Sequence, residues 1–240
     1  AQNICGGDDR FPGILGSRIC KVFDQIIART GLGEAEAAEA GHDVETVLVP
    51  GPDREHFMPG VGLVCLKLVF DRRTRRLLGV QGIGDGAVDK RVDAAAMAIR
   101  HGVTLDELAN ADLCYAPARS SAMDNLVTAA NVARNKLDGH LVGCRPADVR
   151  AMTDRKEDFV LLDVRTPDEH EKLRLAHSEF IPLGSLRGRM STLSPERPVV
   201  TFSHLSLRAY EAALILRAAG CRDVRVMEGG TAMWPYEVIE

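Results

Sequence analysis

The residues Ser203 to Arg208 read SHLSLR and connect an apolar run, VVTF, to a segment of helical composition, RAYEAALILRAAG. A strand that enters a helix through a short loop directs several backbone N–H groups and the positive end of the helix at one place, which suits a bound anion. A cysteine at such a helix N-terminus becomes reactive, whereas this loop begins with Ser203. The pattern predicts an anion site whose chemistry depends on a serine hydroxyl.

The Ser203 hydroxyl is a poor nucleophile in this position. Lowering a pKa by one unit requires about 1.4 kcal/mol, whereas a helix N-terminus supplies about 0.3–1 kcal/mol and at most ~2 kcal/mol. Activation therefore needs a general base, and His204 is the only neighbour in the loop that could serve. Because adjacent loop residues usually point in different directions, the alternative interpretation of His204 is a solvated loop histidine.

The composition indicates a chain of two ordinary globular domains. The chain has 240 residues, 45% hydrophobic and 27% charged, which is enough for two hydrophobic cores. The formal net charge of −4 disfavours nucleic acid as a partner. No apolar run reaches the roughly 18 residues of a transmembrane helix and no signal segment is present, so we expect a cytoplasmic protein without a membrane partner. The six cysteines form no C-x-x-C pair, so we expect mostly buried thiols and no metal site.

The first half has the pattern of an α+β domain with an antiparallel sheet. Apolar residues at helical spacing, followed by Gly31, predict a helix over Ser17–Thr30. Strand composition occurs over Val44–Val49 and Leu63–Phe70, and the second run leads through DRRTRRLLG into VQGIG, which indicates a hairpin. We expect further helices at 89–101, 104–109 and 123–137.

The second half alternates strands and helices, which is typical of an α/β domain with a parallel sheet and helices on both faces. A helix at 146–152 precedes the strands FVLLDV and VVTF, the helix RAYEAALILRAAG and the strand VRVM. The pattern changes near residue 143, so we predict domains at 1–142 and 143–240.

This second half resembles rhodanese-like domains. The segments that carry the resemblance are LLDVRTPDEHE, FIPLGSLRGRM and MEGGTAMW, whereas EKLRLAHSEF departs from the family pattern. In active members a six-residue loop begins with a cysteine that accepts a sulfane sulfur and ends with an arginine. The resemblance implies that Ser203 and Arg208 occupy these positions, that His204, Leu205, Ser206 and Leu207 complete an anion-binding loop, and that Asp163 and Arg165 support it.

Serine cannot hold a persulfide, so the resemblance implies a catalytically silent rhodanese-like module. Related domains often carry glycine where this loop has Ser206, and two departures in one loop favour natural loss over an engineered serine. Two alternatives stay open. One is an active sulfurtransferase or persulfide carrier, in an unmutated parent or through another thiol; the other is a regulatory sensor of anions or thiols.

The first half resembles the dimerisation domain of FAD-dependent pyridine nucleotide-disulfide oxidoreductases, in the coenzyme A-disulfide reductase and NADH oxidase branch. The matching segments are ICKVFDQIIARTGL, LKLVFDRRTRRLLGVQGIG, GAVDKRVDAAAMAIRHGVTLDELANADLCYAPARSSAMD and AANVARNKLDG. Some members of that branch carry a rhodanese domain directly after this one.

The resemblance implies a homodimer formed through residues 1–139. Tyr115 matches an active-site tyrosine of the family, or else is a packed interface aromatic, whereas Phe57 stands where a second tyrosine is expected. The segment GVQGIGDG lacks the context of a dinucleotide-binding fingerprint, so we expect FAD and NAD(P)H only in a full-length parent. We therefore expect the C-terminal portion of a longer reductase without a complete active site of its own; the alternative is part of a coenzyme A-disulfide or polysulfide reductase.

Overall fold

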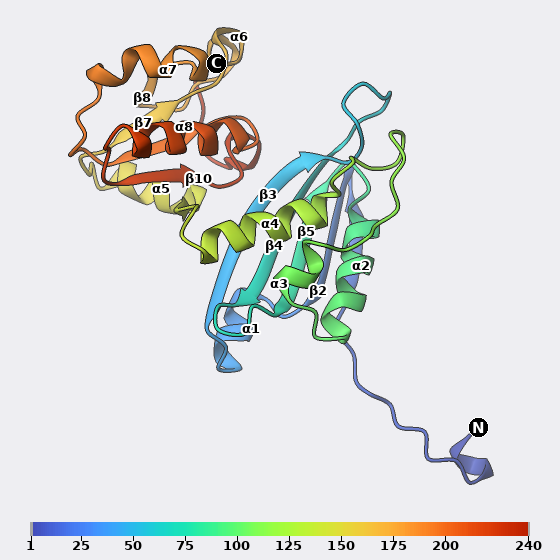
Figure 1. Cartoon of the computed structure of the whole chain (residues 1–240). Helices are drawn as coiled ribbons and strands as arrows, with labels where there is room; N and C mark the ends of the chain where they lie inside the picture. The colour runs from blue at the N-terminus through green and yellow to red at the C-terminus, as the bar shows by residue number, and fades with distance from the viewer. Residues whose placement is uncertain (1, 240) are drawn as a thin grey trace.

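A computed structural model describes residues 2–239 and contains two domains, each built around its own five-stranded sheet (Figure 1). Ala1 and Glu240, the outer limits of the two predicted domains, lie outside the described residues. Between these limits no helix is both long enough and apolar enough to span a membrane. The predicted fold class, an α+β domain followed by an α/β domain, is confirmed.

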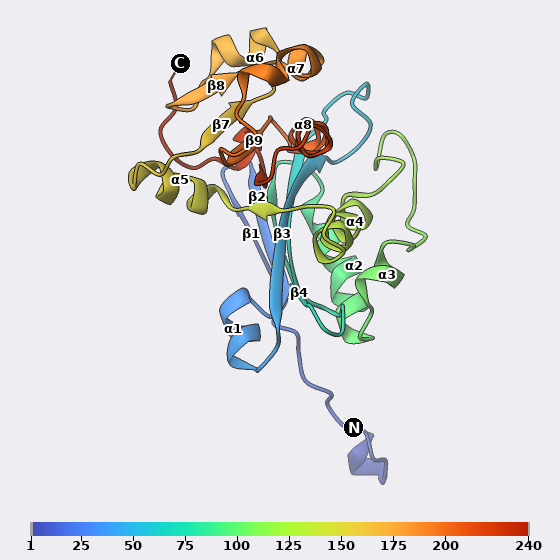
Figure 2. The same ribbon diagram turned by 60° about the vertical axis from the view of Figure 1, so that its left-hand side comes forward.

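The sheet of the first domain is antiparallel throughout and has the strand order β1-β2-β5-β4-β3. Its strands are β1 (Arg18–Val22), β2 (Gln25–Gly31), β3 (Val44–Pro52), β4 (Leu63–Asp71) and β5 (Leu77–Gly84). Three helices cover one face: α2 (Val88–Arg100), α3 (Leu105–Leu108) and α4 (Asn125–Leu137). The short helix α1 (Glu34–Glu39) lies on the opposite side, near one end of the sheet (Figure 2).

The helix predicted over Ser17–Thr30 is wrong, because this segment forms the β1–β2 hairpin. Phe23 turns the chain with a left-handed backbone, φ 53°. The segment is rich in β-branched residues, which favour strands, and β2 pairs along its whole length but for Gln25 with β5. The apolar residues are also spaced as in a helix, but pairing of β1 with β2 and of β2 with β5 decides the structure in favour of strands.

The second domain has a parallel sheet of order β6-β10-β9-β7-β8. Its strands are β6 (Gly143–Cys144), β7 (Val160–Asp163), β8 (Ser178–Phe180), β9 (Val199–Phe202) and β10 (Val224–Met227). Its helices are α5 (Pro146–Asp154), α6 (Pro167–Lys172), α7 (Leu183–Arg189) and α8 (Leu207–Ala218), with 3-10 turns at Met190–Thr192 and Thr231–Met233. Buried residues of α7 and α8 pack on one face of the sheet and those of α5 on the other.

A buried ion pair joins the two domains at the edge strand β3. Glu228, which follows β10, accepts hydrogen bonds from Lys136 Nζ at 2.7 Å through Oε1 and from the Leu48 N–H at 2.9 Å through Oε2. Lys136 Nζ also donates to the Thr46 carbonyl at 2.8 Å. We call this arrangement the Lys136–Glu228 bridge. Burial raises the pKa of Glu228, although Lys136 and the Leu48 N–H favour its ionised form.

The bridge occupies backbone groups of β3 that β4 leaves unpaired. Thr46 and Leu48 use their outward carbonyl and N–H for it, and farther along the same edge Pro50 and Pro52 have no N–H to expose. An edge strand with open N–H and C=O groups is a template for unwanted pairing. The second domain and the two prolines together close this edge.

We predict that Lys136→Met lowers the free energy of unfolding by about 3–5 kcal/mol, because it leaves the Glu228 carboxylate buried without its cation. The double variant Lys136→Met/Glu228→Gln should recover most of this loss, since glutamine still accepts from the Leu48 N–H and carries no charge. Urea unfolding measures both, with Lys172→Met on the exposed side of α6 as the control. A loss below about 1 kcal/mol for Lys136→Met would mean that the bridge behaves as an ordinary surface pair.

Candidate functional site

The residues from Ser203 to Arg208, here called the Ser203–Arg208 loop, connect the buried strand β9 to α8. Ser203 is only 1% exposed, and its Oγ accepts a hydrogen bond from the Ala209 N–H at 3.3 Å. Ser206 adopts a left-handed backbone, φ 75°, a conformation that favours glycine. Its Oγ donates to the Met227 carbonyl at 3.2 Å, so a side-chain hydrogen bond supports the strained residue.

The segment that follows β10 forms hydrogen bonds with the carbonyl groups of the Ser203–Arg208 loop. The N–H groups of Thr231 and Ala232 donate to the carbonyls of Ser203 and His204 at 2.9 and 3.2 Å. A Cβ at Gly230 would lie 2.3 Å from the Ser203 carbonyl oxygen, so only glycine allows this approach. Within residues 2–239 the amide N–H groups of 204–208 donate to no protein atom. The loop therefore has its carbonyls bound and its amides available, which is the polarity that an anion requires.

Arg208 is engaged by α6. Its two terminal nitrogens each donate to Glu169 at 2.7 Å, a bidentate pair that lowers the pKa of Glu169 to about 2. Glu169 also receives the Thr166 N–H at 2.9 Å in the capping box of α6. In this arrangement the charge of Arg208 is largely compensated by Glu169, so an anion bound here would depend mainly on the loop amides.

Asp163 and Arg165 form a buried pair beneath α6. Arg165 donates to Asp163 at 3.0 and 2.7 Å, through Nε and Nη2, and to the Leu173 carbonyl. His170 Nδ1 lies 3.0 Å from Asp163 Oδ2. These contacts bind the end of β7 to the C-terminal half of α6, the helix that also carries Glu169 to Arg208.

His204 has an exposed side chain, and its Nδ1 lies 3.2 Å from Thr231 Oγ1. Partial desolvation lowers its pKa, and the nearby Arg165 and Arg208 add to the effect, against Glu169. His204 is thus neutral near pH 7, but its hydrogen bond is to Thr231, and Ser203 Oγ is bonded to a backbone amide. The geometry does not assemble a serine–histidine pair.

Tyr115 lies elsewhere, on a half-exposed loop of the first domain. This loop contacts the one that carries Phe57, because the Glu55 N–H donates to the Pro117 carbonyl at 3.2 Å. Within the described chain no hydrogen bond or shared cavity joins Tyr115 to the Ser203–Arg208 loop. The structure therefore brings together Asp163, Arg165 and the loop, but not Tyr115.

A cleft of about 330 Å³ lies between the two domains, and no motif in the sequence predicted it. The Ser203–Arg208 loop contributes Leu205, Ser206 and Leu207 to its wall, and the facing wall comes from the second half of β3 and from α4. Such a site depends on how two separate domains dock, and the only local signal in the sequence is the proline pair in the VPGP of the edge strand.

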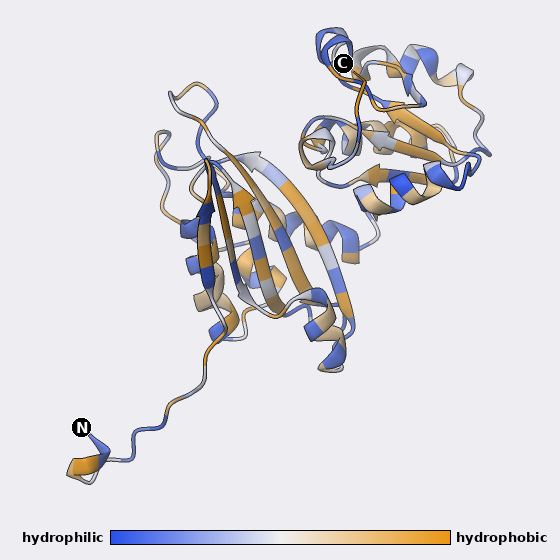
Figure 3. Ribbon diagram, turned by 180° about the vertical axis from the view of Figure 1, so that it is seen from behind, coloured by the Kyte–Doolittle hydropathy of each residue, from blue (hydrophilic) through white to orange (hydrophobic). Residues whose placement is uncertain are grey.

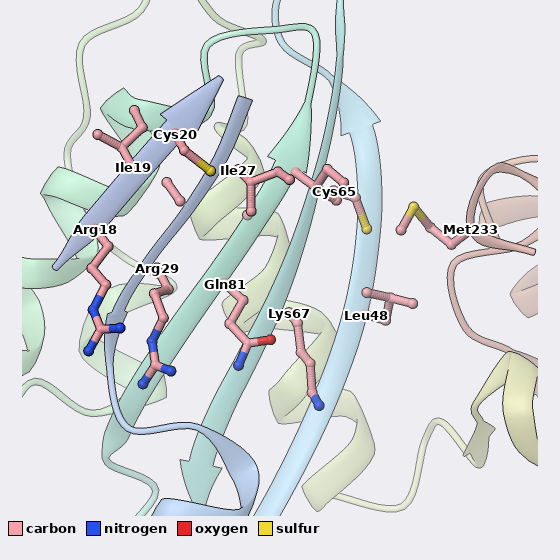
Figure 4. A pocket seen from close by; sticks show the side chains of 13 residues that line it. Arg18, Ile19, Cys20, Ile27, Arg29, Leu48, Cys65, Lys67, Gln81 and Met233 are labelled. Atoms are coloured by element: carbon pink, nitrogen blue, oxygen red, sulfur yellow. The ribbon is translucent and has the colours of Figure 1, made fainter. Parts of the chain in front are cut away.

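A second hollow, of about 740 Å³, lies on the open face of the first sheet. Strands of mixed polarity form this face (Figure 3), and side by side across it lie Arg18, Arg29, Gln81 and Lys67 (Figure 4). Arg29 and Lys67 are paired with Glu36 and Glu34 of α1. No residue of the Ser203–Arg208 loop lines this hollow, so it is separate from the candidate site.

The prediction that most cysteines are buried is wrong. Cys65 and Cys144 are buried, and burial raises the pKa of each thiol to about 12. Cys221 is half-buried, whereas Cys5, Cys20 and Cys114 are exposed. Cys20 is exposed because it lies on the open sheet face (Figure 4), a location that depends on the hairpin that was expected to be a helix.

Comparison with known families agrees with both folds. Residues 18–127 match the pyridine nucleotide-disulphide oxidoreductase dimerisation domain, and residues 145–236 match the rhodanese-like domain. The chain therefore consists of a pyridine nucleotide-disulphide oxidoreductase dimerisation domain followed by a rhodanese-like domain.

Similar proteins match either nearly the whole chain or about half of it. A NAD-dependent persulfide reductase from A. fulgidus is 41% identical, with a TM-score of 0.89 over 97% of this chain and 42% of that one. The Bacillus anthracis CoADR-RHD is 30% identical, with a TM-score of 0.89 over 99% of this chain and 43% of that one. The NAD(P)H sulfur oxidoreductase (CoA-dependent) of Pyrococcus furiosus is 40% identical over 55% of this chain and 29% of its own length. The chain thus spans less than a third of that curated relative.

The segment GVQGIGDG does not have the geometry of a dinucleotide-binding turn. Binding FAD or a nicotinamide requires a glycine-rich turn between a parallel strand and a helix. The glycines of GVQGIGDG instead lie in β5 and in the turn to α2, and β5 is antiparallel to both its neighbours.

We predict that Glu169→Gln destabilises the protein by an amount that depends on pH. The pKa of Glu169 is lowered to about 2 in the folded chain, so its stabilising contribution is present above pH ~4.5 and is lost as the pH falls towards 2. Because the pair is about one-third exposed, we expect on the order of 1 kcal/mol at pH 7 and a vanishing difference near pH 2. Urea unfolding at several pH values measures this, with Glu171→Gln as the control; a difference that stays constant with pH contradicts it.

Proposed function

We propose that this chain is the dimerisation and rhodanese-like part of a flavin-dependent disulfide or persulfide reductase, and that its rhodanese-like domain binds sulfur-carrying anions without holding sulfur covalently. Two similar structures that match nearly the whole of this chain, a NAD-dependent persulfide reductase and a CoADR-RHD, support the first part. The second part depends on one observation, the buried hydroxyl of Ser203 at the base of a loop with available amides.

Covalent sulfur transfer through this loop would require a sulfur–sulfur bond, which a hydroxyl cannot form. Ser203 has a backbone amide as its hydrogen-bond partner and no adjacent base. Non-covalent binding makes no demand on the hydroxyl, because the amides of 204–208 and the N-terminus of α8 supply the attraction. The loop is therefore suited to bind an anion and release it unchanged.

An active sulfurtransferase remains the second candidate, because the loop conformation is intact. Ser206 adopts the backbone angle that glycine would provide, so a cysteine at position 203 would meet a formed loop. Another thiol of this domain is a weaker candidate. Burial raises the pKa of Cys144 to about 12, which leaves almost no thiolate at neutral pH.

We further propose a homodimer formed through the first domain, with FAD and NAD(P)H bound only in a full-length parent. The first domain exposes apolar side chains around its open sheet, among them Ile19, Val22, Phe23 and Ile27. Exposed apolar surface of this kind marks an interaction site. Cytoplasmic location is part of the same proposal.

Sedimentation of the purified chain should give a dimer at micromolar concentration, because stable homodimers bury more than ~2,000 Å². Phe23→Asp, at the tip of the β1–β2 hairpin, should shift the equilibrium towards monomer, whereas Leu214→Asp on α8 of the second domain should not. A monomer at high micromolar concentration contradicts the proposed dimer.

The chain should form no thiocyanate from thiosulfate and cyanide above a blank, and no persulfide should appear on residue 203 by mass spectrometry. Ser203→Cys should gain measurable activity, because a thiolate at a helix N-terminus can attack thiosulfate, expel sulfite and pass the retained sulfur to cyanide. The double variant Ser203→Cys/Ser206→Gly should be more active, since glycine adopts the left-handed angle without strain.

Ser203→Ala is the control for anion binding. It removes the hydroxyl but not the loop amides, so sulfate should bind to it as to the unmodified chain. Turnover by the unmodified chain rejects the silent-module proposal. Full, family-like activity of Ser203→Cys alone would instead favour a parent with cysteine at this position.

A further inference from the structure

The cleft between the domains adjoins the proposed anion site. It has a volume of about 330 Å³ and shares Leu205, Ser206 and Leu207 with the Ser203–Arg208 loop. Three of the six loop residues thus also belong to the wall of this cavity, and inorganic sulfate or thiosulfate bound at the loop would leave the cavity unused. The volume falls at the small end of the range for organic ligands.

The walls of the cleft are mainly apolar. The apolar residues that line it, from both domains, are Leu48, Val49, Pro50, Pro52, Met123, Val132, Leu141, Leu205, Leu207, Tyr210 and Val226. Glu228 also lines it, but its carboxylate is bound by Lys136 and by the Leu48 N–H. These walls therefore favour binding of an uncharged hydrocarbon group.

A further observation points to an occupant. Leu207 and Met123, which face the cleft from different domains, are 67% and 56% exposed, so both walls offer apolar side chains that nothing covers.

We propose that the cleft binds the apolar group of an organic sulfur anion whose charged head lies on the loop amides. The chemical class is a sulfonate, thiosulfonate or persulfide with an alkyl or aryl group of about six carbons, a size that a cavity at the small end of the ligand range can hold. This inference rests on the proposed anion-binding function of the loop. It adds that the chain binds organic sulfur anions more tightly than inorganic ones.

The test compares methanesulfonate with hexane-1-sulfonate by isothermal titration calorimetry on the full chain. Each methylene that becomes buried strengthens binding about fourfold. If three of the five additional methylenes enter the cleft, hexane-1-sulfonate should bind about 60-fold more tightly. Sulfate is titrated in parallel to report on the loop alone.

Thr128→Trp, on the α4 wall, should fill the cleft without touching the loop or the Lys136–Glu228 bridge. We expect it to reduce hexane-1-sulfonate affinity to the methanesulfonate level and to leave sulfate and methanesulfonate affinity unchanged. Met97→Trp is the matched control, because Met97 lies on α2, is exposed and does not line the cleft; it should retain the full chain-length effect.

The outcomes separate this inference from the function on which it rests. Equal affinity for the two sulfonates, with sulfate bound, overturns the cleft inference and leaves the anion loop standing. A chain-length effect that survives Thr128→Trp also overturns it, because the hydrocarbon then lies elsewhere. Failure of sulfate and methanesulfonate to bind at all rejects the anion loop itself, whatever hexane-1-sulfonate does.

Discussion

The Lys136–Glu228 bridge is the contact on which the geometry of the candidate site depends. It combines a 2.7 Å ion pair with hydrogen bonds to the backbone of Thr46 and Leu48, so the second domain is held to one register of the β3 edge. Gly143 makes this possible, because a Cβ there would lie 1.9 Å from Glu228 Oε1. A buried ion pair of this kind adds little net stability compared with an apolar contact of similar shape, but it specifies one arrangement of the two domains. The cleft and the position of the loop beside it follow from that arrangement.

Around the Ser203–Arg208 loop, the hydrogen bonds divide the backbone into two sides. The N–H groups of Thr231 and Ala232 donate to two loop carbonyls. The hydroxyl of Ser206, which has a left-handed backbone, donates to the Met227 carbonyl. The amides of the loop remain without protein partners in the described chain. The proposed anion site is made of backbone, so it would not require a cysteine at position 203. The Arg208–Glu169 pair moderates the site, because it compensates the cation that would otherwise add to the attraction.

Much of this organisation could be predicted from the sequence, and the exceptions have physical causes. The alternating strands and helices of the second half and the hairpin at DRRTRRLLG were recognisable because each is specified by local periodicity and turn residues. The segment Ser17–Thr30 misled because its β-branched residues also fall at helical spacing, and only pairing with β5 decides between the two. The Arg208–Glu169 pair and the cleft were not predictable, because each joins residues far apart in sequence.

The central claim is that the loop binds a sulfur anion reversibly through its backbone. Amide NMR spectra of the 15N-labelled chain, recorded during a thiosulfate titration, test this most directly. The account predicts saturable shifts of the His204–Arg208 amide signals that reverse completely on dialysis, with no gain in mass. Absence of shifts at these amides would contradict it, and so would shifts that persist after dialysis together with a mass gain of one sulfur atom.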